Sequence, residues 1–161
     1  MLTLAKLLLS QDVPVHAIGI QGHYEFGEVP YEEIETTFEE IRRLGLKVMI
    51  SEVDIDVVKR GKWWADDGKH REELKSFDPY KDGLTPELES ELAAQYGKLF
   101  ELYARNADVV ERVTFWGLHD GANWLNHYPW ERKNHALLFD RELKKKPAYH
   151  AVIKALLKHQ P

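Results

Sequence analysis

Amphipathic helical segments alternate with short apolar segments along most of the chain, and this alternation restricts the possible fold more than any other feature. We expect helices over residues 2–10, 30–44, 85–106 and 147–158, and strands over residues 15–20, 46–50 and 111–117. The segment LKVMI at 46–50 is a continuous apolar run, which is typical of a parallel strand covered on both faces. Strands that alternate with helices predict a parallel sheet with the helices outside it. The predicted fold class is therefore α/β, with three βα units preceded by one helix.

Three strands are too few to close a sheet, so the pattern indicates part of a larger structure. An open three-stranded parallel sheet would leave both of its edge strands bare. A TIM (β/α)8 barrel typically needs about 250 residues, whereas this chain has 161. The first predicted helix also begins at Met1, with no capping residue before it. We therefore expect a partial TIM barrel in which residues 1–161 form the carboxy-terminal part of a single domain and the first part is absent.

The composition disfavours several classes of function. The net charge of −5 argues against a nucleic-acid partner or an anionic membrane surface, and the basic run at residues 144–146 is expected to be the solvated start of a helix. The chain has no cysteine, which excludes disulfides, thiolate catalysis and cysteine-ligated metals. No segment has the roughly 18 consecutive apolar residues of a membrane span. Residues 2–9 fit an amphipathic helix better than an export signal.

Polar or aromatic residues follow each of the three predicted strands. Gln21 and His23 follow the first strand, Glu52 and Asp54 follow the second, and the third ends in Trp116, with His119 and Asp120 after it. In β/α-barrels the catalytic residues lie at the carboxyl ends of the strands, and alternation along a strand places Glu52 and Asp54 on one face. One such acid alone is more often a helix cap or a solvated loop residue. Such residues at all three strand ends together indicate a functional site.

Four motifs, in this order, resemble glycoside hydrolase family 10, the endo-β-1,4-xylanases: GIQGH, ISEVDI, VTFWGLHDGANWLN and LLFDRELKKKPAYHAV. The resemblance covers nearly the whole chain and is weakest over residues 57–84. It implies an eight-stranded barrel in which the three predicted strands are the sixth, seventh and eighth. It also implies hydrolysis of xylan or xylo-oligosaccharides with retention of configuration, without a metal or another cofactor. Members of this family are commonly secreted, so the resemblance implies an extracellular location.

The resemblance assigns catalytic roles to three residues. Glu52 matches the nucleophile at the end of the seventh strand, where the family usually reads T-E-L-D and this chain reads S-E-V-D. His23 matches a histidine that hydrogen-bonds the nucleophile, and Asp54 matches the acid that holds that histidine. A hydrogen bond donated to an ionised carboxylate favours the charged form that a nucleophile needs.

The resemblance also assigns four residues to sugar binding. Gln21 matches a residue that lines the sugar site next to the scissile bond. Trp116 and Trp124 match two tryptophans that floor and cover that sugar, and His119 matches a position near the glycone subsites. Aromatic rings supply the rigid apolar surface on which a sugar ring can stack.

One required group has no counterpart in the sequence. The acid/base of the family is a glutamate in a W-D-V-x-N-E motif at the end of the fourth strand, and no such motif occurs here. Glu25 and Glu28 follow the first predicted strand, but their loop positions give no reason for them to point at the leaving oxygen. We therefore expect negligible xylanase activity from the chain alone, and a need for a complementary barrel fragment or a second copy.

Three other functions fit parts of the same pattern. A similar barrel could belong to a cellulase or a mannanase, since many such barrels also carry the nucleophile on the seventh strand. A non-catalytic carbohydrate-binding module would use Trp63, Trp64 and Trp124 as sugar platforms. A metal-dependent hydrolase would bind zinc through histidines and carboxylates at the strand ends, although no H-x-H or H-E-x-x-H spacing is present. The residues available for such a zinc site are His23, Glu52, Asp54, His119 and Asp120.

Overall fold

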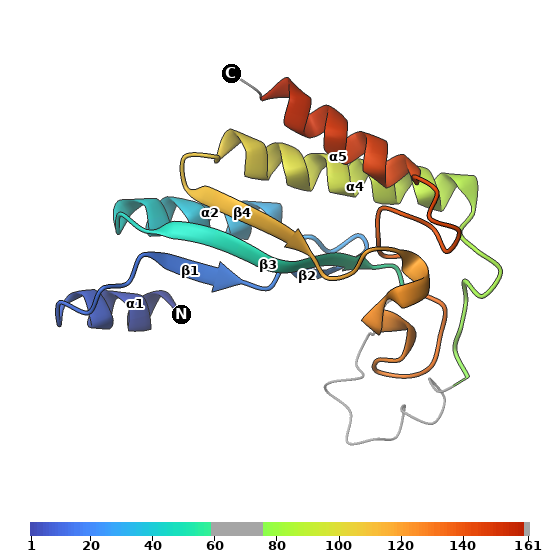
Figure 1. Ribbon diagram of the computed structural model, residues 1–161, viewed down its shortest axis with the longest axis horizontal. Helices are drawn as coiled ribbons and strands as arrows, with labels where there is room; N and C mark the ends of the chain where they lie inside the picture. Colours follow the sequence, from blue (N-terminus) through green and yellow to red (C-terminus); the bar gives the residue numbers. More distant parts are fainter. Residues whose placement is uncertain (59–75, 160–161) are drawn as a thin grey trace.

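The computed structural model describes residues 1–58 and 76–159, which form a parallel β-sheet with helices packed along it (Figure 1). Trp63 and Trp64 lie outside the described residues. The predicted α/β class with parallel strands is confirmed. In chain order the elements are α1 (Leu2–Leu9), β1 (Ala17–Ile20), β2 (His23–Glu25), α2 (Tyr31–Arg43), β3 (Lys47–Asp56), α4 (Pro86–Arg105), β4 (Val110–Phe115), the short 3₁₀ helices η2 (Asp120–Ala122) and η3 (Trp124–Asn126), and α5 (Pro147–Lys158).

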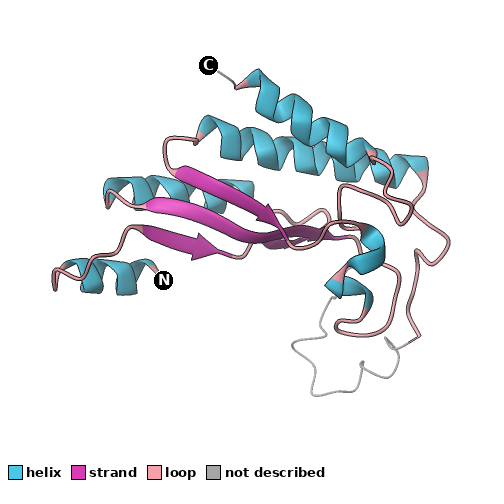
Figure 2. Ribbon diagram, viewed as in Figure 1, coloured by secondary structure: helices cyan, strands magenta, loops and turns pink. Residues whose placement is uncertain are grey.

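β3 is the central strand of the sheet. β1 pairs with it in parallel, with Ile20 opposite Ile50, and β4 pairs with it in parallel, with Val113 opposite the same residue. Because both neighbours pair with one residue of β3, they lie on opposite edges of that strand. The carboxyl ends of these strands point toward the same end of the molecule, where the loop after β4 and the 3₁₀ helices lie (Figure 2). That end is where parallel β/α folds place their functional side chains.

The sequence predicts three strands, whereas the structure has a fourth, β2, which pairs in parallel with β3 through His23 opposite Asp54. Gly22 separates β1 from β2 and has φ +86°, in the left-handed region that favours glycine. A Cβ at this position would lie 2.8 Å from Cγ2 of Ile50. The turn of the backbone at Gly22 therefore separates β1 from a second short strand that lies beyond the predicted one.

β3 also extends beyond its predicted end at residue 50, as far as Asp56. The residues from Ser51 onward are largely polar, so hydrophobicity alone indicates that the strand has ended. Pairing with β2 keeps these residues in the sheet. Glu52 and Asp54 consequently lie within the strand and not in the loop after it.

The helices begin close to the residues that the sequence indicates. Thr85 caps α4 by accepting a hydrogen bond from Leu88 N at 3.4 Å, and Pro86 occupies the first turn. α2 follows Pro30, and α5 begins at Pro147. None of the helices within the described ranges is long and apolar enough to cross a membrane.

The core lies between β3 and the helices. Its fully buried apolar side chains include Val48, Ile50, Val53 and Ile55 of β3, Phe38 and Ile41 of α2, and Leu92, Tyr96 and Leu99 of α4. The hydroxyl of Tyr96 accepts a hydrogen bond from Ile55 N at 3.1 Å and donates one to Ala136 O at 2.5 Å. This buried hydroxyl ties β3 and α4 to the loop before α5, which brings the functional loops against the end of the sheet.

Candidate active site

Glu52 and His23 are in direct contact at the carboxyl end of the sheet. Glu52 lies on β3, His23 opens β2, and Glu52 Oε2 lies 3.2 Å from His23 Nε2. The side chain of Glu52 keeps 22% of its surface exposed. Its other oxygen, Oε1, has no hydrogen bond within the described part of the chain. One oxygen of this carboxylate is therefore held by His23, and the side chain as a whole stays partly exposed.

Asp54 holds the opposite side of the imidazole. Its Oδ1 lies 2.9 Å from His23 Nδ1, and its Oδ2 accepts a hydrogen bond from Trp124 Nε1 at 2.8 Å. The residue is 1% exposed, so a charge here depends on these two donors for stabilisation. The pairing of β2 with β3, which sets His23 opposite Asp54, produces this contact directly.

His23 faces a carboxylate at each of its ring nitrogens. A neutral imidazole has one N–H donor, so only the imidazolium can donate to Glu52 and Asp54 at the same time. Burial lowers the pKa of His23, but the hydrogen bonds and negative charges of Asp54 and Glu52 outweigh burial, and the pKa lies above its usual value of 6.5. The site therefore favours a positive ring between two carboxylates.

Trp124 joins this group to an aromatic pair. Its ring centroid lies 5.1 Å from that of His23 with the planes tilted by 51°, and 5.1 Å from that of Tyr128 with the planes 22° apart. Trp116, which follows β4, is 45% exposed. An exposed indole at a strand end and a half-buried one beside the imidazole both offer apolar surface to a sugar.

The two other predicted sugar-binding residues lie at the margins of this group. Gln21 sits between β1 and β2, is exposed, and its backbone oxygen accepts a hydrogen bond from Glu52 N at 2.8 Å. His119 uses Nδ1 to accept a hydrogen bond from Gly121 N at 3.1 Å, which caps η2. Within the described ranges no polar contact joins His119 to the Glu52–His23 pair.

The loop between β4 and α5 is anchored by residues that the sequence analysis does not single out. Asp56 Oδ2 accepts a hydrogen bond from Arg132 Nη2 at 2.9 Å, and Asp56 Oδ1 accepts one from Asn134 Nδ2 at 2.6 Å. The alternation of Glu52, Asp54 and Asp56 along β3 could have indicated Asp56. Nothing local indicates Arg132, because its partner is 76 residues away in the chain.

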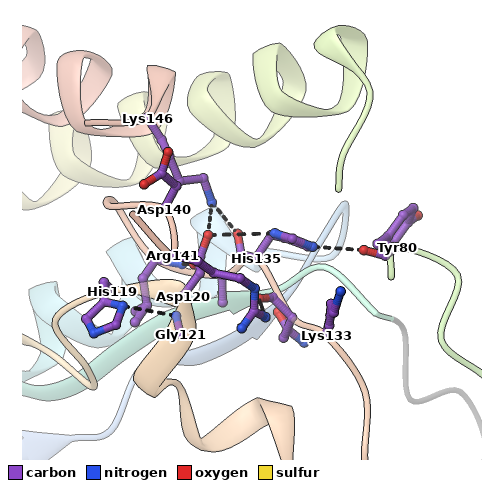
Figure 3. A network of polar contacts seen from close by, with 12 residues as sticks. Tyr80, His119, Asp120, Gly121, Lys133, His135, Asp140, Arg141 and Lys146 are labelled. Carbon is purple, nitrogen blue, oxygen red and sulfur yellow. Dashed lines mark hydrogen bonds and ion pairs between the residues drawn. The ribbon is translucent and has the colours of Figure 1, made fainter. Parts of the chain in front are cut away.

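Figure 3 shows a second buried network that anchors the same loop. Asp120 Oδ2 pairs with Lys146 Nζ at 2.9 Å, and Asp120 Oδ1 accepts a hydrogen bond from Leu137 N at 2.8 Å. Lys146 Nζ also donates to His135 O at 2.6 Å. Lys146 is 5% exposed, so the expectation of a solvated basic run is wrong at this residue, which the buried acid holds inside. Burial raises the pKa of Asp120, and the charge of Lys146 offsets only part of this effect.

Two of the carboxylates in the hypothetical zinc site already bind donors of the protein. Both oxygens of Asp54 accept hydrogen bonds, and so do both oxygens of Asp120. The described residues contain no group of three or more histidines, cysteines or acids arranged to hold a metal ion. This part of the structure gives the metal-hydrolase hypothesis no support.

Known proteins match the chain in sequence over nearly its full length. The endo-1,4-beta-xylanase of Geobacillus stearothermophilus is 35% identical over 152 residues, which are 94% of this chain and 42% of the relative. The thermostable celloxylanase of Thermoclostridium stercorarium is 33% identical over 150 residues, which are 93% of this chain and 35% of the relative. The chain therefore spans less than half the length of these curated relatives.

Solved structures match the fold as well. A family 10 endoxylanase retrieved from a sugarcane soil metagenome has a TM-score of 0.82 and 36% identity, covering 95% of this chain and 43% of that one. The family 10 xylanase of Thermobacillus composti has a TM-score of 0.80 and 32% identity, covering 96% and 46%. A mutant protein in complex with xylotriose has a TM-score of 0.78 and 27% identity, covering 94% and 43%. The model of the glycosyl hydrolase family 10 matches residues 1–155, and the chain belongs to this family.

Proposed function

We propose that this chain carries the nucleophile and part of the sugar site of a retaining endo-β-1,4-xylanase. The observation that carries the proposal is the contact of Glu52 with His23, which is backed in turn by Asp54 and Trp124. Family membership and the xylanase names of the relatives support it. Of the carboxylates along the end of β3, Glu52 is the one with a partly exposed side chain and an oxygen that makes no hydrogen bond to the described residues.

In the proposed reaction, Glu52 attacks the anomeric carbon of the xylose on the glycone side of the scissile bond. A bond forms from a carboxylate oxygen to that carbon while the bond to the leaving oxygen breaks, and an acid protonates the leaving oxygen. The conjugate base of that acid then deprotonates a water molecule, which attacks the same carbon and releases Glu52. Two displacements at one carbon retain its configuration.

His23 and Asp54 keep Glu52 oriented through this change of charge. Glu52 is negative before the attack and becomes a neutral ester in the intermediate, so its attraction to His23 weakens at that stage. Asp54, which is buried and bonded to the other ring nitrogen, continues to hold the imidazole. Asp54 is therefore a positioning residue, which acts on the nucleophile through His23.

Four further residues are proposed to contact the sugar. Trp116 would stack beneath the sugar next to the scissile bond, because its indole is exposed at the end of β4. Trp124 would cover the same sugar from its position beside His23. Gln21 would also bind this sugar, because its backbone oxygen accepts a hydrogen bond from Glu52 N and the residue therefore lies beside Glu52. His119 would lie toward the glycone side.

We further propose that β1 with its continuation β2, then β3, then β4 are the sixth, seventh and eighth strands of a (β/α)8 barrel, and that the acid/base lies outside residues 1–161. Among the described strands, β1 and β4 pair only with β3, so each has a bare edge that further strands could cover. A complementary barrel fragment that pairs with both edges would bring the second carboxyl group to about 5–5.5 Å from Glu52, as a retaining enzyme requires. Size-exclusion chromatography tests this assembly: a stable, well-folded monomer would count against it, and self-association would indicate a second copy as the partner.

Covalent trapping tests the role of Glu52 in the chain as it stands. A 2-deoxy-2-fluoroxylobioside with a dinitrophenolate leaving group needs no proton from an acid, because the leaving group is a weak base. We expect slow addition of one xylobiosyl group to the peptide that contains Glu52, seen by mass spectrometry, and none in Glu52→Gln. An adduct on any other carboxylate would refute the assignment. Hydrolysis of xylan by the isolated chain should be negligible, and robust hydrolysis that is lost in Glu52→Ala would place the acid/base within these residues.

Substrate comparison separates the xylanase from the alternatives. The protein reassembled with the missing barrel segment should hydrolyse xylan faster than cellulose or mannan, and the reverse order would favour a cellulase or a mannanase. A binding module makes a different prediction. If Glu52→Gln leaves both xylotriose binding and the reassembled activity intact, Glu52 is not a nucleophile and the binding function is favoured.

A further inference from the structure

A second buried carboxylate of β3 holds the loop that carries Trp124. Asp56 lies two residues after Asp54, and its side chain is 0% exposed. It accepts hydrogen bonds from Arg132 Nη2 at 2.9 Å and from Asn134 Nδ2 at 2.6 Å. Both donors belong to the loop between β4 and α5. This loop is therefore bonded to β3 at Asp56 and also at Asp54, which accepts a hydrogen bond from Trp124.

Arg132 connects Asp56 to the backbone of Tyr128. Its Nη1 donates a hydrogen bond to Tyr128 O at 2.6 Å, while its Nη2 binds Asp56. The guanidinium also lies over the ring of Trp130, with a distance of 4.6 Å to the centroid. A planar guanidinium presents its donors in fixed directions. The position of Tyr128 relative to the end of β3 is therefore set by one rigid, buried group.

The ring of Tyr128 in turn stacks on Trp124, and Trp124 donates its N–H to Asp54. The contacts thus run from Asp56 through Arg132, Tyr128 and Trp124 to Asp54, so they start and end on β3. We propose that Arg132 is a positioning residue, which holds Tyr128 so that Trp124 stays bonded to Asp54. The consequence for sugar binding rests on the proposed function, whereas the consequence for the position of Trp124 does not.

The pair formed by Asp120 and Lys146 is a matched control for this idea (Figure 3). Its side chains are 1% and 4% exposed, so it is nearly as buried as the Asp56–Arg132 pair. It anchors the same loop through Leu137 N and His135 O and makes no hydrogen bond to the aromatic pair among the described contacts. Breaking it should destabilise the chain without removing a contact of Trp124.

The test compares Arg132→Lys with Lys146→Met in the full chain. Lysine keeps a positive charge near Asp56, but a single ammonium group cannot occupy the positions of both Nη atoms. The measurements are the thermal unfolding temperature, the indole N–H resonance of Trp124 (assigned with Trp124→Phe) and binding of xylotriose by calorimetry. Lys146→Met should lower the unfolding temperature and leave the resonance in place. Arg132→Lys should move the resonance toward that of a water-exposed indole and weaken xylotriose binding by about threefold or more.

Tyr128→Ala keeps the test decisive if Arg132→Lys does not fold. It deletes the stacked ring but retains the backbone oxygen that Arg132 binds, and it should displace the Trp124 resonance in the same direction. An unchanged resonance in folded Arg132→Lys or in Tyr128→Ala refutes the proposal, and so does an equal displacement in Lys146→Met. If the wild-type chain, reassembled with the missing barrel segment, does not bind xylotriose, the proposed function fails, and the resonances still decide the role of Arg132.

Discussion

Asp54→Asn is the most informative single substitution at this site. Asp54 accepts one hydrogen bond from His23 and one from Trp124, on different oxygens. Asparagine keeps the shape but has one acceptor oxygen, so one donor loses its partner and the negative charge beside His23 is lost. A hydrogen bond to a charged group contributes about 1.5–3 kcal/mol. Because the side chain of His23 is 18% exposed and partly hydrated, we expect a loss near the lower end, about 2 kcal/mol of unfolding free energy.

The size of this loss depends on pH through His23. The folded pKa of His23 lies above 6.5 because Asp54 and Glu52 outweigh the opposing effect of burial. Stabilisation of the imidazolium is therefore fully present below about pH 6.5 and is lost as the pH rises through the folded pKa. Since Asp54→Asn removes much of that stabilisation, the difference between the two proteins should be largest near pH 6 and smaller near pH 9.

Urea unfolding of both proteins at the two pH values measures this difference. Near pH 6 the variant should also melt about 4–8 °C lower, as expected for about 2 kcal/mol in a chain of this size. NMR titration of His23 should give a lower midpoint in the variant. Asp108→Asn is a suitable control, because it breaks an exposed pair with Arg42 and its effect should not change between these pH values. An equal loss for Asp54→Asn at both values, with an unchanged His23 midpoint, would refute the reasoning.

Three other substitutions test separate parts of the structure. Trp124→Phe removes the indole donor from the buried acid that holds His23, so the pKa of His23 measured by NMR should rise, and a fall would contradict the network. Gly22→Ala places a Cβ 2.8 Å from a neighbouring side chain at a positive φ, and it should cost about 2–4 kcal/mol in urea unfolding. Gly19→Ala meets nothing within 4 Å and should change stability by less than about 1 kcal/mol, so equal costs would refute the steric argument. Tyr96→Phe leaves two backbone groups without their buried partner and should cost about 2–3 kcal/mol; a loss below about 0.5 kcal/mol would show that these groups find other partners.

Local rules predict that His23, Glu52 and Asp54 lie at one end of the sheet, whereas the contacts among them are implied by the family resemblance. Polar residues after apolar strands mark the functional end of a parallel sheet, and side chains two apart on a strand share a face. The structure brings these three side chains together, with His23 bonded to both acids as the resemblance implies. Their catalytic roles stay predictions until the trapping experiment is done.

Other features depend on contacts between distant segments, and the sequence does not indicate them. β2 exists because Gly22 bends the chain and the extended β3 offers it a partner. Lys146 resembles its basic neighbours in sequence, yet it is buried because Asp120 approaches from another loop. Tyr128 belongs to a loop without a recognisable pattern, and its place beside Trp124 depends on a partner of Arg132 far away in the chain.

Three acids on alternate positions of β3 differ in burial and in hydrogen-bond partners, and these differences support the different roles proposed for them. The side chain of Glu52 is 22% exposed, that of Asp54 is 1% exposed and that of Asp56 is 0% exposed. Both deeper acids have each oxygen occupied by a donor of the protein, so neither can attack a sugar without first breaking buried hydrogen bonds. Glu52 has one oxygen held by His23 and the other without a hydrogen bond among the described residues, which suits the nucleophile proposed here. In the proposed function the same side-chain chemistry would attack at Glu52, orient at Asp54 and anchor at Asp56, and the burial and hydrogen-bond partners of each acid decide which.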